Sequence, residues 1–307
     1  MIYTVTFNPS LDYILDVPQF NMEVVNRASK ERIIPGGKGI NVSIVLQNLG
    51  VMNRAICYTA GFTGDALRAL LDERNINADY IKLDNGLTRI NVKLRCGGET
   101  EINGQGPQIG MQDMVALYEK LGYLDEDDFL VLAGSLPDTM AHTTYTEIMQ
   151  LLQYNHIRII VDTTKDLLLP VLPYKPFLVK PNAYELGQLF DVEIKTKQDA
   201  VAYAKKLQEM GALNVLVSMA ADGAVLVTED GNVYEADAPK GTVRNSVGAG
   251  DSMLAGFLAG YMEKSDMEYA FHMGVSAGSA SAFSEGFATK SEIQVLYQNF
   301  FAKNSNS

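Results

Sequence analysis

The chain has 307 residues, of which 47% are apolar and 20% charged, and its formal net charge is −12. This composition is that of a globular protein and excludes a disordered chain. An acidic surface repels the phosphates of nucleic acids and the headgroups of anionic membranes. Neither nucleic acid nor membrane is therefore expected as a partner, and an anionic ligand would have to be met by a few locally placed cations.

The N-terminal sequence and the cysteines predict a cytoplasmic protein. MIYTVTFNPS lacks the basic region and apolar run of a signal peptide, and no window reaches the roughly 18 apolar residues that a membrane span needs. Cys57 and Cys96 belong to no CxxC pair or His/Cys cluster. Both are expected to be buried, reduced thiols.

Short β-rich apolar segments alternate with helical segments along most of the chain, which predicts an α/β fold with a mostly parallel sheet. The predicted strands are 2–7, 129–133, 158–162, 177–180 and 213–218. The predicted helices are 40–49, 111–121, 141–154, 183–190, 198–211, 250–262, 267–283 and 290–301. The strands are nearly continuous apolar runs, as expected where helices cover both faces.

Two segments, about 11–34 and 89–103, interrupt this alternation. In RINVKLRC at 89–96, polar and apolar side chains alternate, which is typical of a one-sided antiparallel strand. We expect both segments to pair as a small sheet beside the main one, serving as a lid, a dimer surface or both. The chain is then a single domain spanning 1–307.

A glycine-rich segment, Asn245-Ser-Val-Gly-Ala-Gly-Asp251, leads directly into an apolar helix. Gly248, Ala249 and Gly250 let backbone N–H groups approach an anion, and a helix N-terminus adds a favourable dipole. Asp251 then lies where a carboxylate stays ionised and can accept the proton of a substrate hydroxyl. A plain helix cap after a glycine loop is the structural alternative.

Two other segments have patterns that could bind an anion or a metal ion but that also have an ordinary structural explanation. GGKGIN at 36–41 opens a helix with bare glycines and a lysine but matches neither Walker A nor GxGxxG, so it is equally a glycine turn with a solvated lysine. Asn182 and Glu185 have the spacing of a capping box, and Glu185 could also approach a divalent ion through water. Lys180, just before them, can neutralise phosphate charge.

In this order the motifs resemble those of the ribokinase-like sugar kinases, most closely the phosphofructokinase B branch, and the resemblance covers nearly the whole chain. The matching segments are TFNPSLD at 6–12, GGKGIN at 36–41, TEIN at 100–103, AGSLP at 133–137, KPNAYE at 180–185, the Ser218 to Gly223 turn and SVGAGD at 246–251. The resemblance implies a mostly parallel central sheet with helices on both faces and a small β lid. It also implies transfer of the γ-phosphoryl group of ATP, with Mg²⁺, to a sugar hydroxyl.

The resemblance assigns a role to each matching residue. Asp251 is the implied catalytic base, with Gly248, Ala249 and Gly250 as an anion hole. The implied substrate-binding residues are Asp12, Arg27, Gly37, Lys38, Asn41, Arg89, Asn103 and Ser135. The implied nucleotide-binding residues are Lys180, Asn182, Ser218, Gly223, Gly248 and Gly250. Glu185 is implied to hold Mg²⁺ through water, and Arg27 matches a basic residue that reaches across a homodimer formed through the lid.

Within this branch, RINVKL at 89–94 and LPYKP at 172–176 are most similar to kinases that convert fructose 1-phosphate to fructose 1,6-bisphosphate at the C6 hydroxyl. Kinases of tagatose 6-phosphate or fructose 6-phosphate are alternatives, as is a non-catalytic sugar-phosphate sensor. The presence of Asp251 argues against a sensor, which needs no base. One departure from the family pattern is Asp162-Thr-Thr-Lys165, where Asp-Thr-Ser-Gly is more usual.

Overall fold

The computed structural model describes residues 1–302 and is built around a nine-stranded sheet of order β13-β12-β11-β10-β9-β8-β1-β4-β5. Its strands are β1 (Ile2–Thr6), β4 (Asn53–Ala60), β5 (Ala78–Leu83), β8 (Phe129–Ala133), β9 (Arg158–Asp162), β10 (Leu178–Val179), β11 (Asn214–Ser218), β12 (Ala224–Val227) and β13 (Val233–Ala236). Neighbours run parallel from β5 to β11, and only β12 and β13 join antiparallel. The expected mostly parallel sheet is confirmed.

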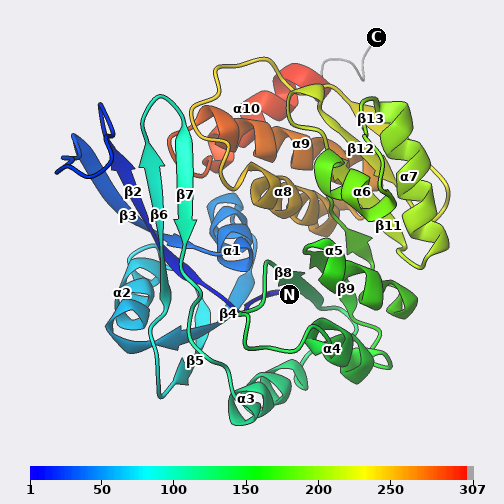
Figure 1. Ribbon diagram of the computed structural model, residues 1–307. Coiled ribbons are helices and arrows are strands. Elements are labelled where there is room, and N and C mark those ends of the chain that lie inside the picture. Colours follow the sequence, from blue (N-terminus) through cyan, green and yellow to red (C-terminus); the bar gives the residue numbers. More distant parts are fainter. Residues whose placement is uncertain (303–307) are drawn as a thin grey trace.

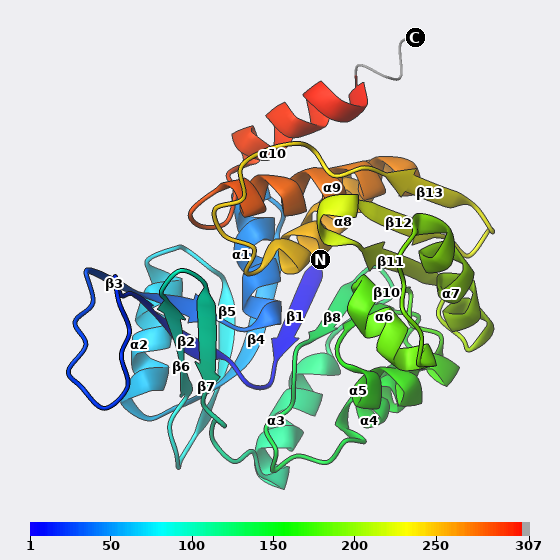
Figure 2. The same ribbon diagram turned by 45° about the horizontal axis from the view of Figure 1, so that its top comes forward.

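Helices cover both faces of this sheet (Figure 2). They are α1 (Lys38–Leu49), α2 (Gly61–Asp72), α3 (Met111–Leu121), α4 (Thr144–Leu152), α5 (Lys165–Leu168), α6 (Ala183–Phe190), α7 (Lys197–Glu209), α8 (Ala249–Lys264), α9 (Met267–Phe283) and α10 (Lys290–Tyr297). Side chains of α3 to α7 form one core with the sheet, and those of α1, α8, α9 and α10 form another on the opposite face. Because both faces are covered, β8 is apolar throughout and the inner residues of β9 are apolar.

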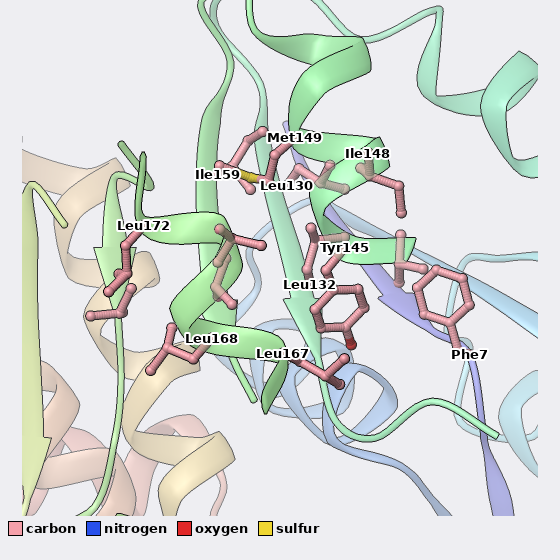
Figure 3. Close-up of a cluster of buried hydrophobic side chains, with 14 of the residues drawn as sticks. Phe7, Leu130, Leu132, Tyr145, Ile148, Met149, Ile159, Leu167, Leu168 and Leu172 are labelled. Atoms are coloured by element: carbon pink, nitrogen blue, oxygen red, sulfur yellow. The ribbon is translucent and has the colours of Figure 1, made fainter. Parts of the chain in front are cut away.

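The core that the sheet forms with α3 to α7 also fixes the position of a loop at the edge of the sheet (Figure 3). Tyr145 of α4 is fully buried, and its ring centroid lies 5.6 Å from that of Phe7. Its hydroxyl donates to the carbonyl of Gly134, which follows β8, over 3.1 Å. Thr163 donates to the same carbonyl over 2.9 Å. The core thereby holds the turn after β8 in place at the carboxyl edge of the sheet.

A second sheet of four strands, order β3-β2-β6-β7, stands beside α1 and α2 (Figure 1). Its strands are β2 (Ser10–Asp16), β3 (Lys30–Gly36), β6 (Arg89–Arg95) and β7 (Glu99–Asn103). The antiparallel pairing expected for β6 holds with β7 only, because β6 runs parallel to β2. The two inserted segments therefore meet through a parallel pair, with a hairpin on each side.

The polar side of β6, rather than its apolar side, is the covered one. Asn91 and Lys93 are 7% and 5% exposed, whereas Ile90 is 43% exposed. An alternating strand normally turns its apolar face inward. Here the polar face is shared with Asp12 of β2, whose side chain pairs with Lys93 and accepts a hydrogen bond from Asn91, so most of these buried polar groups have a partner.

The cysteine prediction is half right: Cys57 is buried in β4, but Cys96 is exposed. Cys96 lies just after β6, at the hairpin turn that contains Gly97 and Gly98, and its Sγ is 4.0 Å from the Pro18 carbonyl oxygen. Burial raises the pKa of the Cys57 thiol to about 12, so it stays protonated at neutral pH. Within residues 1–302, every helix is too short or too polar to cross a membrane.

Candidate active site

Several of the predicted site residues meet Asp162 at the carboxyl ends of the parallel strands, the edge where open α/β sheets bind ligands. Asp162 is the last residue of β9, and Lys180 directly follows β10. Lys38 is the first residue of α1, with Gly37 as its N-cap, and Asp251 lies in the first turn of α8. Segments distant in sequence thus meet at one edge of the sheet.

Asp162 joins two lysines at the centre of the site. Its Oδ1 lies 2.9 Å from Lys38 Nζ and its Oδ2 lies 3.2 Å from Lys180 Nζ. Burial favours the neutral form of Asp162, but Lys180 and Lys38 outweigh it and hold the pKa of this carboxyl below its usual value. Burial likewise opposes the charge on Lys38, yet Asp162, Asp251 and Glu185 raise its pKa. Lys38 is therefore cationic, and the ammonium groups of both lysines are in place to meet an anion.

Asp251 is 6% exposed, and its Oδ2 accepts a hydrogen bond from Asn41 Nδ2 over 2.8 Å. Burial and the negative charge of Asp162 raise the pKa of Asp251, although Lys38, the Asn41 bond and Lys180 act in the opposite sense. A carboxyl whose pKa is raised toward neutrality is a better proton acceptor than an ordinary one. The geometry therefore suits a general base held in one orientation.

The glycine segment before Asp251 forms the start of α8 as predicted, one residue earlier than expected. Gly248 is the N-cap with φ +75°, and a Cβ atom there would lie 2.5 Å from the Phe287 ring. Gly250 lies beside Lys180, whose Nζ is 3.2 Å from where a Cβ would stand. The Ala249 N–H donates to the Ser246 carbonyl over 3.2 Å. Because Gly250 has no side chain, the backbone of the first turn of α8 lies directly beside the ammonium group of Lys180.

The Asn182 to Glu185 segment is the capping box that its spacing predicts. Asn182 Oδ1 accepts from the Glu185 N–H over 2.7 Å, and Glu185 Oε2 accepts from the Asn182 N–H over 2.8 Å. Asn182 also forms a parallel bridge with Ser218 at the end of β11. Gly223, in the following turn, has φ +94°, and a Cβ there would lie 1.9 Å from the Ala236 carbonyl oxygen. The fold alone therefore requires a glycine at position 223.

Asp12 lies at the inner face of the small sheet. Its Oδ1 accepts from Ser10 Oγ over 2.6 Å and from Asn91 Nδ2 over 3.0 Å. Asp12 and Asn41 line one cavity of about 420 Å³, together with Ile34, Val247 and Phe287. Asn41 thus both lines this cavity and bonds directly to Asp251.

Within residues 1–302, four predicted substrate-binding residues form no hydrogen bond or ion pair with Asp162, Asp251 or the partners of these two carboxylates. Arg89 donates from Nε to the Asn8 carbonyl over 3.1 Å, and burial lowers the pKa of its guanidinium, which Asp12 partly offsets. Arg27 is exposed in the loop between β2 and β3, and Asn103 is exposed at the end of β7. Ser135 is exposed next to Gly134, which neighbours Lys38.

Two charged residues of the site received no role from the sequence. Asp162 was noted only as part of an unusual segment, although its place at the end of an apolar strand is a signal that could have found it. Lys93 stood on the polar side of an alternating strand, which normally faces water. Its Nζ in fact lies 3.3 Å from Asp12 Oδ2.

Known proteins resemble this chain over almost all of its length. The pfkB family carbohydrate kinase model matches residues 6–294. The 1-phosphofructokinase of Bacillus subtilis is 48% identical, covering 96% of this chain and 97% of its own. The D-tagatose-1-phosphate kinase of Bacillus licheniformis is 32% identical, covering 97% and 100%.

Among solved structures, phosphofructokinase-2 from Escherichia coli in complex with substrates and products is 30% identical, with a TM-score of 0.92 and coverage of 97% and 99%. The expected ribokinase-like fold is confirmed, since the ribokinase of Arabidopsis thaliana also shares it. A match over most of the chain, at 48% identity to one family member, leaves one conclusion. This protein belongs to the pfkB family of carbohydrate kinases.

Proposed function

We propose that this kinase transfers the γ-phosphoryl group of ATP to the C6 hydroxyl of fructose 1-phosphate, giving fructose 1,6-bisphosphate. The observation that carries the chemistry is the buried Asp251 carboxylate, fixed by Asn41 at the start of α8. The choice of sugar phosphate rests on the B. subtilis relative. Because ATP and sugar phosphates are metabolites of the cytoplasm, we also propose that location.

In the proposed reaction, Asp251 accepts the proton of the attacking hydroxyl as that oxygen bonds to phosphorus and ADP leaves. Gly248, Ala249 and Gly250 place the start of α8 against the transferred group, where its dipole favours negative charge. Lys180, Asn182, Ser218 and Gly223 form the nucleotide side of the site. Lys180 lies next to Gly250 and supplies the nearest positive charge.

The sugar phosphate is proposed to lie between the small sheet and α1. Asp12, Gly37 and Asn41 face its hydroxyls, and Lys38 and Arg89 hold its phosphate. The Lys38 side chain is 33% exposed and its ammonium is turned toward Asp162, so an entering phosphate can reach it. Ser135, Asn103 and Arg27 are exposed and would complete these contacts when the site closes.

The substrate assignment is tested by ADP release with MgATP and a panel of sugars. Fructose 1-phosphate should give a kcat/KM at least about tenfold above tagatose 1-phosphate, tagatose 6-phosphate, fructose 6-phosphate and fructose, a preference of about 1.4 kcal/mol. Tagatose 1-phosphate is included because a relative that is 32% identical carries that activity in its name. A higher kcat/KM for any other sugar phosphate would refute the assignment but leave the mechanism in place.

We propose Mg²⁺ as the metal, held by Glu185 through water and by the nucleotide phosphates. No group of three or more His, Cys, Asp or Glu side chains within residues 1–302 could hold a metal ion by itself. That fits Mg²⁺, which is usually bound by one or two carboxylates, waters and substrate phosphates. When bound, the ion would neutralise charge on the transferred phosphoryl group.

Replacing Glu185 by Gln should raise the Mg²⁺ concentration for half-maximal activity about tenfold, a typical cost of losing an outer partner of a metal. The amide oxygen can still accept from the Asn182 N–H, so the helix cap is kept. The measurement is the initial rate against free Mg²⁺ at fixed MgATP. An unchanged requirement would remove Glu185 from the metal site.

We further propose that residues 1–307 form one domain in which the small sheet is a lid and also the surface of a homodimer. Ile33, Tyr13, Val92 and Ile102 are successive register partners across all four strands. Ile33 is 51% and Ile102 65% exposed, so this row leaves apolar area in water that a second copy would cover.

Replacing Ile102 by Glu should convert a dimer into a monomer, because it places a charge within the apolar row. Sedimentation equilibrium or light scattering would give the mass. Met52→Glu is the matched control, since Met52 is 78% exposed but lies outside the small sheet. A wild-type protein that is monomeric at micromolar concentration would exclude this surface as a stable dimer interface.

A further inference from the structure

Lys93 is a buried cation whose charge is used inside the small sheet. Its side chain is 6% exposed, and its Nζ lies 3.3 Å from Asp12 Oδ2 and 3.3 Å from Glu101 Oε1. Glu101 is the cross-strand partner of Lys93 on β7, and its side chain is 40% exposed. A lysine is rarely buried without a partner, because desolvation of its ammonium is costly. These two carboxylates explain why the charge of Lys93 can be buried.

The contacts around Asp12 suggest why a cation stands there. Oδ1 already accepts two hydrogen bonds, from Ser10 and Asn91, whereas Oδ2 is paired with Lys93. Asn91 itself is 7% exposed, and its Oδ1 has no hydrogen-bond partner within the described chain. A buried acceptor without a donor costs free energy unless a ligand supplies the donor. A sugar hydroxyl beside Asp12 would do so.

A direct contact between Lys93 and the substrate phosphate is less consistent with these facts. Two carboxylates already neutralise its charge, and its side chain is almost fully covered. Lys38, in contrast, has a side chain that is 33% exposed. A phosphate would also have to approach Asp12 and Glu101, both of which repel it.

We propose that Lys93 is a positioning residue for the sugar: it fixes the Asp12 carboxylate, so that Asp12 and Asn91 together present acceptors to the sugar hydroxyls. Glu101 holds the other side of the ammonium and keeps it out of the sugar site. This inference rests on the proposed role of Asp12 in sugar binding. It adds a residue on β6 that acts through Asp12 and not by touching the substrate.

The test is a double-mutant cycle with Lys93→Met, Asp12→Asn and the double variant, measured by initial rates. The sugar is whichever phosphate the wild-type enzyme turns over fastest, so failure of fructose 1-phosphate would overturn the proposed substrate and leave this comparison intact. Lys93→Met should raise KM for the sugar phosphate about 30-fold, a typical cost of truncating one partner of a buried charge pair. KM for MgATP should not change, and Lys93→Arg should recover most of the loss.

The double variant decides between positioning and direct contact. If Lys93 acts through Asp12, the double variant binds sugar no worse than Asp12→Asn alone; a further loss of about 30-fold would overturn the proposal. An unchanged sugar KM in Lys93→Met would overturn it too. Lys82→Met, at an exposed lysine of β5, is the control and should match wild type. If Lys93→Met fails to fold, the double variant, in which the net charge is unchanged, is compared with Asp12→Asn. The same difference in sugar KM then distinguishes positioning from direct contact.

Discussion

Replacing Asp251 by Asn should lower kcat about 1000-fold, within the range expected for loss of a general base and equal to about 4 kcal/mol of barrier. The amide has nearly the same shape and can still accept from Asn41 Nδ2 through its oxygen. The fold and both substrate sites should therefore be kept. KM for MgATP should stay within about twofold, and equilibrium binding of the sugar phosphate should be retained.

The pH dependence gives a second, independent reading of the same residue. Burial and Asp162 raise the pKa of Asp251, so the carboxyl protonates at a higher pH than an ordinary aspartate. In the wild type, kcat/KM should fall as the pH drops through that raised pKa, because only the ionised form accepts a proton. The residual activity of Asp251→Asn should lack this acid limb, while the titration of the substrate phosphate affects both proteins equally. A variant with near wild-type kcat would remove Asp251 as the base.

Much of the fold followed from the pattern of apolar residues. The predicted ranges 111–121, 129–133, 158–162 and 267–283 coincide with α3, β8, β9 and α9. The segment 53–83 received no prediction, although it holds β4, α2 and β5. Helix α2 begins at Gly61 after Ala60, and no side chain caps it, so the usual start signal is missing. Strand β4 is a nearly continuous buried run, and its apolar residues could have revealed it.

The motifs predicted which residues form the candidate site, but the partners of its charged residues could be identified only from the fold. Asn41 and Asp251 are 210 positions apart, and nothing in the sequence pairs them. The alternation in β6 predicted a one-sided strand, but burial of its polar side could not be predicted, because burial of Lys93 depends on Asp12 and Glu101 from neighbouring strands. Charges are buried where other segments compensate them, and register between strands is a tertiary property.

Asp162→Asn should lower kcat/KM about 100-fold and raise KM for both substrates, because one carboxylate orients a lysine on each side of the site. Asp162 is 1% exposed and binds Lys38 and Lys180 through its two oxygens. Without the negative charge of Asp162, the two ammonium groups repel each other across a neutral amide. Lys38 should then be less well placed for the sugar phosphate, and Lys180 for the nucleotide.

The same change should lower the free energy of unfolding by about 3 kcal/mol at neutral pH, the usual cost of breaking a buried ion pair. The pKa of Asp162 is lower folded than unfolded, so its contribution is complete above the ordinary aspartate pKa and is lost as pH falls toward the folded value. Denaturation of variant and wild type should therefore differ equally from pH 6 to 8 and converge only in strongly acidic solution.

Asp79→Asn is the matched control for this prediction. Asp79 also contacts two cations, Arg54 at 3.3 Å and Lys120 at 3.8 Å, but its side chain is 30% exposed. Screening by water limits such surface pairs to less than about 1 kcal/mol. If the two variants lost equal stability, or if Asp162→Asn kept wild-type KM for both substrates, Asp162 would not be the group that orders the lysines. A selective effect at Asp162 would instead mean that binding of sugar and of nucleotide is coupled through one buried carboxylate.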